Sequence, residues 1–365
     1  MMKDDSDKPT MDINVVMKQA LDTKASDIHL MPGRPPMLRI NGQLAPIPDT
    51  ATLTAQDTKL VAQELANDEQ WAKFEKTREL DLSSSHAGLG RFRVNLYWQR
   101  GSVAIALRLI PTDIPSFEQL GVPVILKKFA MYDHGLVLVT GPTGSGKSTT
   151  LAAMLDHINE NRTCHIVTIE DPIEHLHRHK LSVVNQREMH EDTLSFHEAL
   201  RHVLRQDPNV ILIGEMRDLE TIQTALTIAE TGHLVLATLH TGDAPQALGR
   251  IIDAYPPHQQ HQARTQLSLV LICIMVQHLI RKRDGTGRVL AFELLVATPA
   301  IANLIRSGEV HQIYSSMQSG ASEGMSTLNA SLLKLYRDGQ ITREDVIHMS
   351  TRPKEVLEML GKDKI

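Results

Sequence analysis

The stretch Gly141-Pro142-Thr143-Gly144-Ser145-Gly146-Lys147-Ser148 decides the fold of this chain of 365 residues. Residues 135–140, which precede it, are apolar and partly β-branched, so they predict a buried strand. Residues 149–155, which follow it, predict a helix. A strand, a glycine-rich turn and a helix in this order are the setting of a phosphate-binding loop with the pattern G-x-x-x-x-G-K-S/T. The alternative is a glycine-rich turn that binds nothing.

This loop has the groups that bind a nucleoside triphosphate. Its glycines allow successive backbone N–H groups to face one anion, and the helix start adds the positive end of its dipole. Lys147 can reach the β- and γ-phosphates, and Ser148 can hold Mg²⁺. The predicted nucleotide-binding residues are Gly141, Pro142, Thr143, Gly144, Ser145, Gly146, Lys147, Ser148 and Thr149.

The composition indicates a reduced, cytoplasmic, soluble enzyme. Hydrophobic residues make up 42% and charged residues 22% of the chain, and the net charge of −5 argues against a general nucleic-acid-binding protein. Cys164 and Cys273 lie far apart, so we expect neither a zinc ribbon nor a disulfide scaffold. The acidic N-terminus has no apolar segment typical of a signal peptide. The longest apolar stretch, 267–276, is too short to span a bilayer and predicts a buried helix.

The first part of the chain predicts an α+β domain. Residues 1–10 are expected to be disordered, and 11–110 combine helical periodicity with short strands in a mostly antiparallel sheet. Asn41-Gly42 supplies a hairpin turn. The predicted elements are helices at 12–24 and 54–76, an extended segment from 26, a hairpin at 37–44, and strands at 91–97 and 103–109.

Pro111 and Pro115 mark a linker at 111–116, and a second domain follows at 117–365. There, apolar strands alternate with helices, which predicts an α/β domain whose parallel sheet is covered on both faces. From about residue 257 the pattern predicts helices almost to the end. The predicted strands are 135–140, 165–169, 209–213 and 234–239, and the helices lie near 148–160, 195–205 and 218–230.

Two of these strands end in carboxylates. Residues 210–215 end in Glu215, and residues 165–171 contain Glu170 near their end. Ligands gather at the carboxyl ends of parallel strands, so one acid can hold Mg²⁺ while the other polarises water for attack on the γ-phosphate. The alternative is that both carboxylates only cap helices. Glu174 and Asp218 lie a turn later and are expected to be solvated or paired.

The strand at 234–239 has a histidine at each end, His233 and His240. A histidine beside an apolar strand is usually satisfied within the core. Because this strand should neighbour the phosphate-binding strands, His240 could instead touch the γ-phosphate.

The chain also resembles the secretion and pilus ATPases of the type II/type IV pilus class, and within it the group that retracts pili in twitching motility. The resemblance covers nearly all of the chain after residue 12. Besides the phosphate-binding loop, its specific parts are runs 25–30, 90–95, 168–174, 204–218 and 231–241.

The resemblance implies a homohexameric ATPase with a PAS-like N-terminal domain and a RecA-like core, using ATP and Mg²⁺. It implies that Glu215, with Ser148, holds Mg²⁺ and that Glu170 activates water. His240, and with it His233, would sense the γ-phosphate. The arginines implied to reach the nucleotide across an interface are Arg91, Arg93 and Arg108, with Arg100 as a weaker match; the alternative is solvent-facing edge charges.

The implied setting is the cytoplasmic side of the inner membrane at the pilus base, with a membrane platform protein and a paralogous ATPase as partners and no nucleic acid. Three departures bear on this. Asn209 stands where the family usually has Asp, and Ala302 and Ser307 replace an Arg and a Glu of a helix typical of the retraction group. The alternatives are an accessory or extension-type ATPase, a nucleotide-gated adaptor with little turnover, and a nucleic-acid motor, which the acidic balance disfavours.

Overall fold

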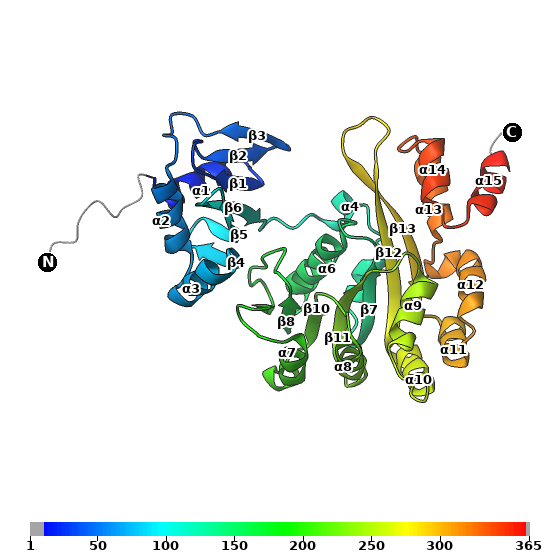
Figure 1. Ribbon diagram of the computed structural model, residues 1–365. Coiled ribbons are helices and arrows are strands. Elements are labelled where there is room, and N and C mark those ends of the chain that lie inside the picture. The colour runs from blue at the N-terminus through cyan, green and yellow to red at the C-terminus, as the bar shows by residue number, and fades with distance from the viewer. Residues whose placement is uncertain (1–10, 363–365) are drawn as a thin grey trace. The chain divides into compact units, whose positions relative to one another are not determined.

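The computed structural model describes residues 11–362, so the disorder expected for residues 1–10 lies outside the described part. The chain divides between Thr112 and Asp113 into two compact units. Figure 1 shows both units.

The first unit is an antiparallel sheet with helices on one face. The six strands lie in the order β3-β2-β1-β6-β5-β4, and every neighbouring pair is antiparallel. Its elements are α1 (Ile13–Asp22), β1 (Asp27–Leu30), β2 (Met37–Ile40), β3 (Gln43–Pro46), α2 (Ala55–Leu65), α3 (Asp68–Thr77), β4 (Glu79–His86), β5 (Gly90–Gln99) and β6 (Ser102–Ile110). The expected α+β class is confirmed here.

Buried apolar residues alternate with polar residues along the strands of this unit, so one face of the sheet packs in the core and the other is polar. Phe92, Val94 and Leu96 of β5 are fully buried and pack in one cluster with Phe74 of α3. Arg91 and Arg93 therefore lie on the opposite face. The helical periodicity expected over 54–76 is confirmed. It is divided into two helices, because Asn67 caps the second by accepting a hydrogen bond from the backbone N–H of Gln70. The sequence analysis also missed β4, a strand of mainly polar residues.

The second unit is built on a seven-stranded sheet in the order β13-β12-β7-β11-β10-β8-β9. All neighbours are parallel except β12 and β13. The strands are β7 (Gly135–Thr140), β8 (His165–Glu170), β9 (Val183–Glu188), β10 (Val210–Ile213), β11 (Leu234–Leu239), β12 (Leu271–Arg281) and β13 (Arg288–Val296). The four predicted strands are confirmed as β7, β8, β10 and β11.

Helices cover both faces of this sheet (Figure 1). Leu136 and Leu138 of β7 point to one core with α7 to α12, whereas Val137 and Val139 point to a second core with α4, α5 and α6. The helices are α4 (Phe117–Leu120), α5 (Ile125–Ala130), α6 (Lys147–Asn161), α7 (Phe196–Val203), α8 (Leu219–Glu230), α9 (Ala244–Asp253), α10 (Gln260–Val270), α11 (Pro299–Ser307), α12 (Ile313–Ser319), α13 (Leu328–Arg337), α14 (Arg343–Met349) and α15 (Pro353–Lys362); short 3₁₀ turns lie at 204–206, 310–312 and 321–323. This arrangement is the RecA-like α/β class that was expected.

The expectation of helices throughout from residue 257 is wrong over 271–296. Only the beginning of the apolar stretch 267–276 belongs to helix α10, and the rest is strand β12, which pairs with β7 on one side and β13 on the other. A strand buried on both faces is apolar along its whole length, so periodicity does not distinguish it from a buried helix. In Figure 1 the β12–β13 hairpin extends beyond the other strands, beside α13 and α14. Within residues 11–362, none of the helices combines the length and apolarity that crossing a bilayer requires.

Candidate nucleotide-binding site

A cavity of about 380 Å³ lies at the carboxyl edge of the parallel sheet in the second unit. The loops after β7, β8, β10 and β11 all contribute to it, because parallel strands end at the same edge. The predicted residues that line it are Thr143, Gly144, Gly146, Lys147, Ser148, Thr149, Glu170, Glu215 and His240.

Backbone geometry fixes the loop between β7 and α6. Gly141 has a φ of +136°, and a Cβ there would collide with the carbonyl oxygen of Gln277 in β12. Gly146 has a φ of +91° and is the N-cap of α6, so the helix begins at Lys147. Gln277 donates a hydrogen bond from Nε2 to Oγ1 of Thr150 in the first turn of α6, at 2.8 Å. Strand β12 therefore lies against the first end of the loop and is hydrogen-bonded to the helix that follows it.

Lys147 is 7% exposed and folds back onto its own loop. Its Nζ donates to the carbonyl oxygens of Gly141 at 2.9 Å and Pro142 at 3.0 Å. Burial lowers the pKa of Lys147, while Glu215 and Glu174 oppose that shift. The ammonium group thus has weak backbone partners that a phosphate oxygen can replace.

Glu170 is a buried carboxyl group at the end of β8. Its Oε1 accepts hydrogen bonds from Oγ1 of Thr168 at 2.7 Å and Nε2 of Gln186 at 3.2 Å. Burial raises its pKa to about 7, although these hydrogen bonds act in the opposite direction. A carboxyl group with this proton affinity suits proton transfer near neutral pH.

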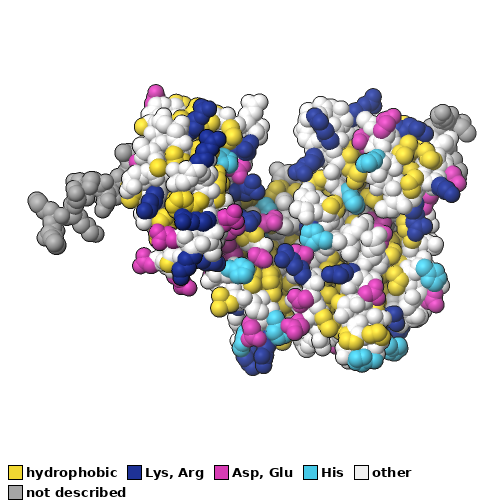
Figure 2. Space-filling model, in the orientation of Figure 1, with side chains coloured by type: hydrophobic (Ala, Val, Ile, Leu, Met, Phe, Trp, Pro, Cys, Tyr) yellow, Lys and Arg dark blue, Asp and Glu magenta, His cyan; other side chains and the backbone are white. Residues whose placement is uncertain are grey.

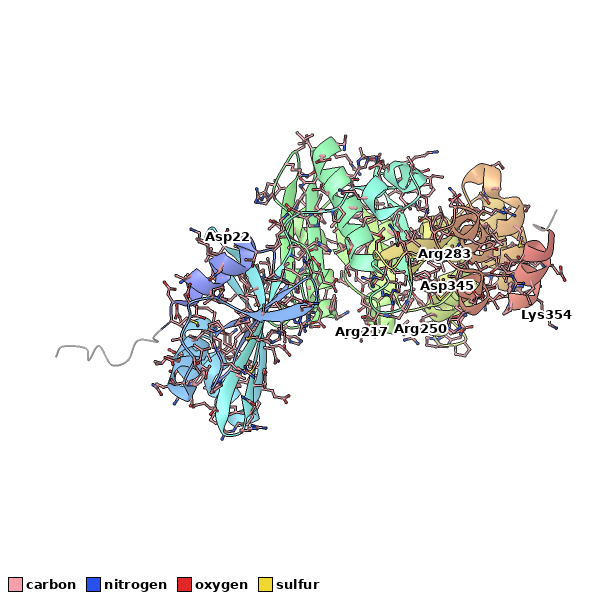
Figure 3. The ribbon with its side chains drawn as sticks, turned by 90° about the horizontal axis from the view of Figure 1, so that it is seen from above. Asp22, Arg217, Arg250, Arg283, Asp345 and Lys354 are labelled. Atoms are coloured by element: carbon pink, nitrogen blue, oxygen red, sulfur yellow. The ribbon has the colours of Figure 1, made fainter. Side chains whose placement is uncertain are left out.

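Glu215 lies in a different electrostatic environment, one residue beyond Gly214 at the end of β10. Arg217 donates from Nε to its Oε2 at 2.8 Å, and Nε2 of His240 lies 3.4 Å from its Oε1. Arg217 also lies 3.9 Å from Asp171, and Nη2 of Arg250 donates to the Arg217 carbonyl at 3.3 Å; Figure 3 labels both arginines. Basic groups therefore hold Glu215 in place.

The structure does not bring His233 to this cavity. It lies just before Leu234, at the amino end of β11, where its carbonyl accepts a hydrogen bond from the N–H of Gly135. His240 lies just after the other end of this six-residue strand, which at about 3.3 Å per residue puts the two histidines roughly 20 Å apart. Within one chain His240 lines the cavity and His233 does not, so the expected role of His233 in sensing the γ-phosphate stays a prediction.

Two acidic or polar positions singled out in the sequence have structural roles. Asp218 caps α8 by accepting a hydrogen bond from the N–H of Thr221 at 2.8 Å. Asn209 lies at the amino end of β10, where its Oδ1 accepts from the N–H of His165 at 2.8 Å. Asn209 is therefore at the sheet edge away from the cavity, so its difference from the family pattern does not affect the phosphate site.

The three arginines expected to assist lie in the first unit. Arg93 and Arg108 are directly opposite each other on β5 and β6, and both are exposed. Nε of Arg108 donates to Oδ1 of Asp27 at 2.8 Å. Arg91 is half-buried on the same face as Arg93, and Arg100 lies at the β5–β6 turn. Their roles toward a nucleotide stay predictions.

Sequence reasoning missed the contribution of the β12–β13 hairpin to the cavity. Leu279 and Arg288 line it, and Nη1 of Arg288 donates to the Gly144 carbonyl at 3.4 Å. His175 and His177, from the loop after β8, also line the cavity, and burial lowers the pKa of His177 to about 4. His175 and His177 closely follow Glu174 in the sequence, so their position beside a predicted strand end could have drawn attention to them. Nothing in the sequence pointed to Leu279 and Arg288, because residues 271–296 were expected to be helical.

Glu170→Gln is expected to stabilise the nucleotide-free protein at alkaline pH. The folded-state pKa of about 7 lies above the ordinary 4.5, so the stability contributed by this proton is complete below about pH 4.5 and is lost as pH rises through about 7. Glutamine has no proton to lose. Between pH 5 and pH 8 the unfolding free energy of the variant should therefore gain about 2–3 kcal/mol relative to the parent.

Urea unfolding of both proteins across this pH range measures that difference. Glu198→Gln, on the exposed side of α7, is the control and should show no comparable trend. A difference between Glu170→Gln and the parent that stays constant with pH would mean that Glu170 titrates as an ordinary carboxyl group.

Comparison with known proteins identifies the family. The type II/IV secretion system protein family matches residues 3–348. The chain is 47% identical to the type IV pilus retraction ATPase PilT of Pseudomonas aeruginosa, over 92% of this chain and 97% of PilT. It is 43% identical to the type IV pilus ATPase PilU of the same organism, over 92% and 88%. A crystal structure of the pilus retraction motor PilT with bound ADP has a TM-score of 0.88 and 49% identity, covering 96% of this chain and 100% of that one. The chain therefore belongs to the type II/IV secretion system protein family.

Proposed function

We propose that this protein is an ATP-hydrolysing motor that retracts type IV pili and so drives twitching motility. The convergence of Lys147, Glu170 and Glu215 on one cavity carries the proposal. The similarity to PilT supports it, since the name of that relative states pilus retraction and the solved PilT structure contains ADP.

In this proposal the phosphates lie against the loop at residues 141–149. Lys147 leaves the carbonyls of Gly141 and Pro142 and binds phosphate oxygens, which are stronger, charged acceptors. The backbone N–H groups at the start of α6 add to this binding. Ser145 is buried with an unpaired hydroxyl, which leaves a further donor in the loop.

The donor set of the cavity fits Mg²⁺. The Ser148 hydroxyl and the Glu215 carboxylate both line it, and hard oxygen ligands of this kind suit Mg²⁺. When bound together with ATP, the ion would neutralise charge on the phosphates. Glu215 would help to hold it, while Arg217 and His240 fix the position of that carboxylate.

Glu170 is the group proposed to accept a proton from the attacking water. Its raised pKa, of about 7, gives it higher proton affinity than an ordinary carboxylate. Thr168 and Gln186 both donate to Oε1 and so fix the position of the carboxyl group at the cavity. His240, 3.4 Å from Glu215, would report on the γ-phosphate.

The nucleoside end of ATP is proposed to leave the loop on the side of β12. Glu170, Glu215 and His240 follow β8, β10 and β11, which lie on one side of β7, so the γ-phosphate points that way. On the other side of β7, Leu279 and Arg288 line both this cavity and a second one of about 620 Å³ between α4, the hairpin and α13. That second cavity offers room for ribose and base.

We further propose a homohexamer in which arginines of the first unit reach a nucleotide at a subunit interface. An arginine supplied in this way stabilises the charge on the transferring phosphoryl group. Arg93→Ala should therefore keep ATP affinity and ring size but lower kcat by about 100-fold. Steady-state hydrolysis, nucleotide titration and light scattering measure the three quantities, with the exposed Arg34→Ala of the same unit as control. Lost ATP binding in an intact ring would contradict this division of roles.

The proposed location is the cytoplasmic face of the inner membrane, where the ring works on a pilus platform protein, with a paralogous ATPase as a possible second partner. Helix α11 corresponds to the helix typical of the retraction group. Ile301 and Ile305 on it are fully buried, so its apolar face is intact, while Ala302 and Ser307 lack the charges of that group. This departure favours an accessory, PilU-like motor as the second candidate.

A chromosomal deletion tests the proposed function. A strain without this protein should be hyperpiliated and unable to spread by twitching, and the parental gene should restore both properties. Loss of pili would instead indicate an extension motor. Normal pili with normal spreading would exclude a retraction role.

On the face drawn in Figure 2, acidic and basic side chains of the described residues are interspersed, which gives no support to a nucleic-acid motor.

A further inference from the structure

A carboxylate outside the cavity joins two helix starts inside the second unit. Glu293 lies on β13 and is 1% exposed. Its Oε1 accepts a hydrogen bond from the N–H of Ala244, the first residue of α9, at 2.8 Å, and the backbone N–H of Leu328, the first residue of α13, also stabilises the charge of this carboxylate. These N–H groups have no partner within their own helices, and a negative charge is favourable at a helix start.

One of these helices begins directly behind the cavity. His240 precedes Ala244 by only four residues. Oγ1 of Thr140 donates to the Thr241 carbonyl at 3.4 Å, and Asp243 caps α9 by accepting from the N–H of Gln246 at 2.7 Å. The start of α9 is therefore one of the contacts that position the segment carrying His240.

The other helix belongs to the C-terminal cluster of α13, α14 and α15. Oγ of Ser350 donates to Oδ1 of Asn329 at 2.7 Å, which ties α13 to the segment before α15. Burial raises the pKa of Glu293, while its backbone donors and the positive charge of Arg352 oppose that shift. Glu293 is thus the shared partner of the C-terminal helices and of the helix that follows His240.

We propose that Glu293 is a positioning residue for His240: it fixes the start of α9 against α13, so that the orientation of His240 in the nucleotide site depends on the C-terminal helices. This inference rests on the proposed function, because it assumes that His240 acts in hydrolysis. Glu293 touches neither cavity, so its loss should affect turnover more than nucleotide binding.

A double-mutant cycle in the full-length protein tests this. A glutamine side chain has one carbonyl oxygen and one NH₂ group, so it can face only one of the N–H groups of Ala244 and Leu328 with an acceptor. The other would meet the NH₂ group, which is also a donor. Glu293→Gln should lower kcat by roughly 10- to 100-fold, the range for a displaced catalytic group, while KM changes less than about twofold. In the His240→Ala background the same substitution should have no further effect on kcat.

Tyr314→Phe is the matched control. It removes the bonds from the Tyr314 hydroxyl in α12 to Glu355 in α15, at 2.9 and 3.0 Å, and changes no group that binds the start of α9. It should lower the melting temperature but keep kcat. If Glu293→Gln fails to fold, Glu293→Asp retains the charge on a shorter side chain and should show a smaller loss with the same dependence on His240.

Two outcomes separate failure of the inference from failure of the proposed function. If His240→Ala lowers kcat and the effects of the two substitutions multiply, Glu293 is only a structural cap and the inference is wrong. If His240→Ala keeps parental kcat, the proposed role of His240 fails and the inference falls with it. Parental kcat in a folded Glu293→Gln protein would also overturn it.

Discussion

Lys147→Ala is expected to lower kcat for ATP hydrolysis by at least roughly 1,000-fold and to weaken nucleotide binding as well. Lys147 is the cation at the start of α6, and alanine leaves the phosphates with backbone N–H groups only. The charge of the transferring phosphoryl group would then be poorly neutralised in both the bound and the transition state. Hydrolysis and fluorescent-nucleotide titration on the purified protein measure the two losses.

Lys180→Ala is the control for this experiment. Lys180 pairs with Asp156 at 2.7 Å and Glu160 at 2.8 Å, two residues of α6, the helix that begins at Lys147. It does not line the cavity. It should retain parental turnover. We expect Lys147→Ala to fold, because the lysine side chain donates hydrogen bonds only to carbonyl groups of its own loop. A Lys147→Ala protein that hydrolyses ATP normally would remove the basis of the proposed function.

Glu215→Gln is expected to bind ATP but to hydrolyse it about 1,000-fold more slowly. Glutamine retains the shape of the side chain but loses the negative charge that attracts Mg²⁺ and pairs with Arg217 and His240. Arg217 and His240 would then face a neutral amide and would no longer fix the side chain at position 215. Single-turnover hydrolysis, with ATP affinity measured separately, distinguishes this result from lost binding.

Glu220→Gln makes the same chemical change outside the cavity. Glu220 lies in the first turn of α8, and its side chain is 69% exposed. The hydrolysis rate of this control should match the parent. Equal rates for the Glu215 and Glu220 variants would show that the carboxylate after β10 has no special part in turnover.

Much of the candidate site could be predicted from the sequence because its elements are local. The loop at 141–148 carries its own geometry in its glycines. Glu170 is the last residue of an apolar strand, and Glu215 and His240 lie within two residues of the end of one. Parallel strands bring such residues to one edge whatever the order of the strands. The same rule has a limit: it holds only for the carboxyl end of a strand, and His233 precedes its strand.

The hairpin could not be predicted by the same reasoning. Residues 271–281 are apolar without a clear period, because β12 is covered on both faces, and the choice between helix and strand depended on neighbours distant in sequence. Arg288 was missed together with its strand. Glu293 lies within an apolar strand, and only the two helix starts that meet there explain a buried carboxylate at that position.

The opposition of Arg93 and Arg108 on β5 and β6 has an electrostatic consequence for the first unit. Like charges on directly opposed cross-strand neighbours repel and weaken a sheet. Because both side chains are exposed, mobile counter-ions screen this repulsion over about 10 Å at 0.1 M salt. The ion pair of Arg108 with Asp27, at 2.8 Å, already offsets part of this repulsion, so an anion bound beside Arg93 should relieve the remainder. Two guanidinium groups on neighbouring strands thus raise the local positive potential, which attracts phosphate-like anions to this surface.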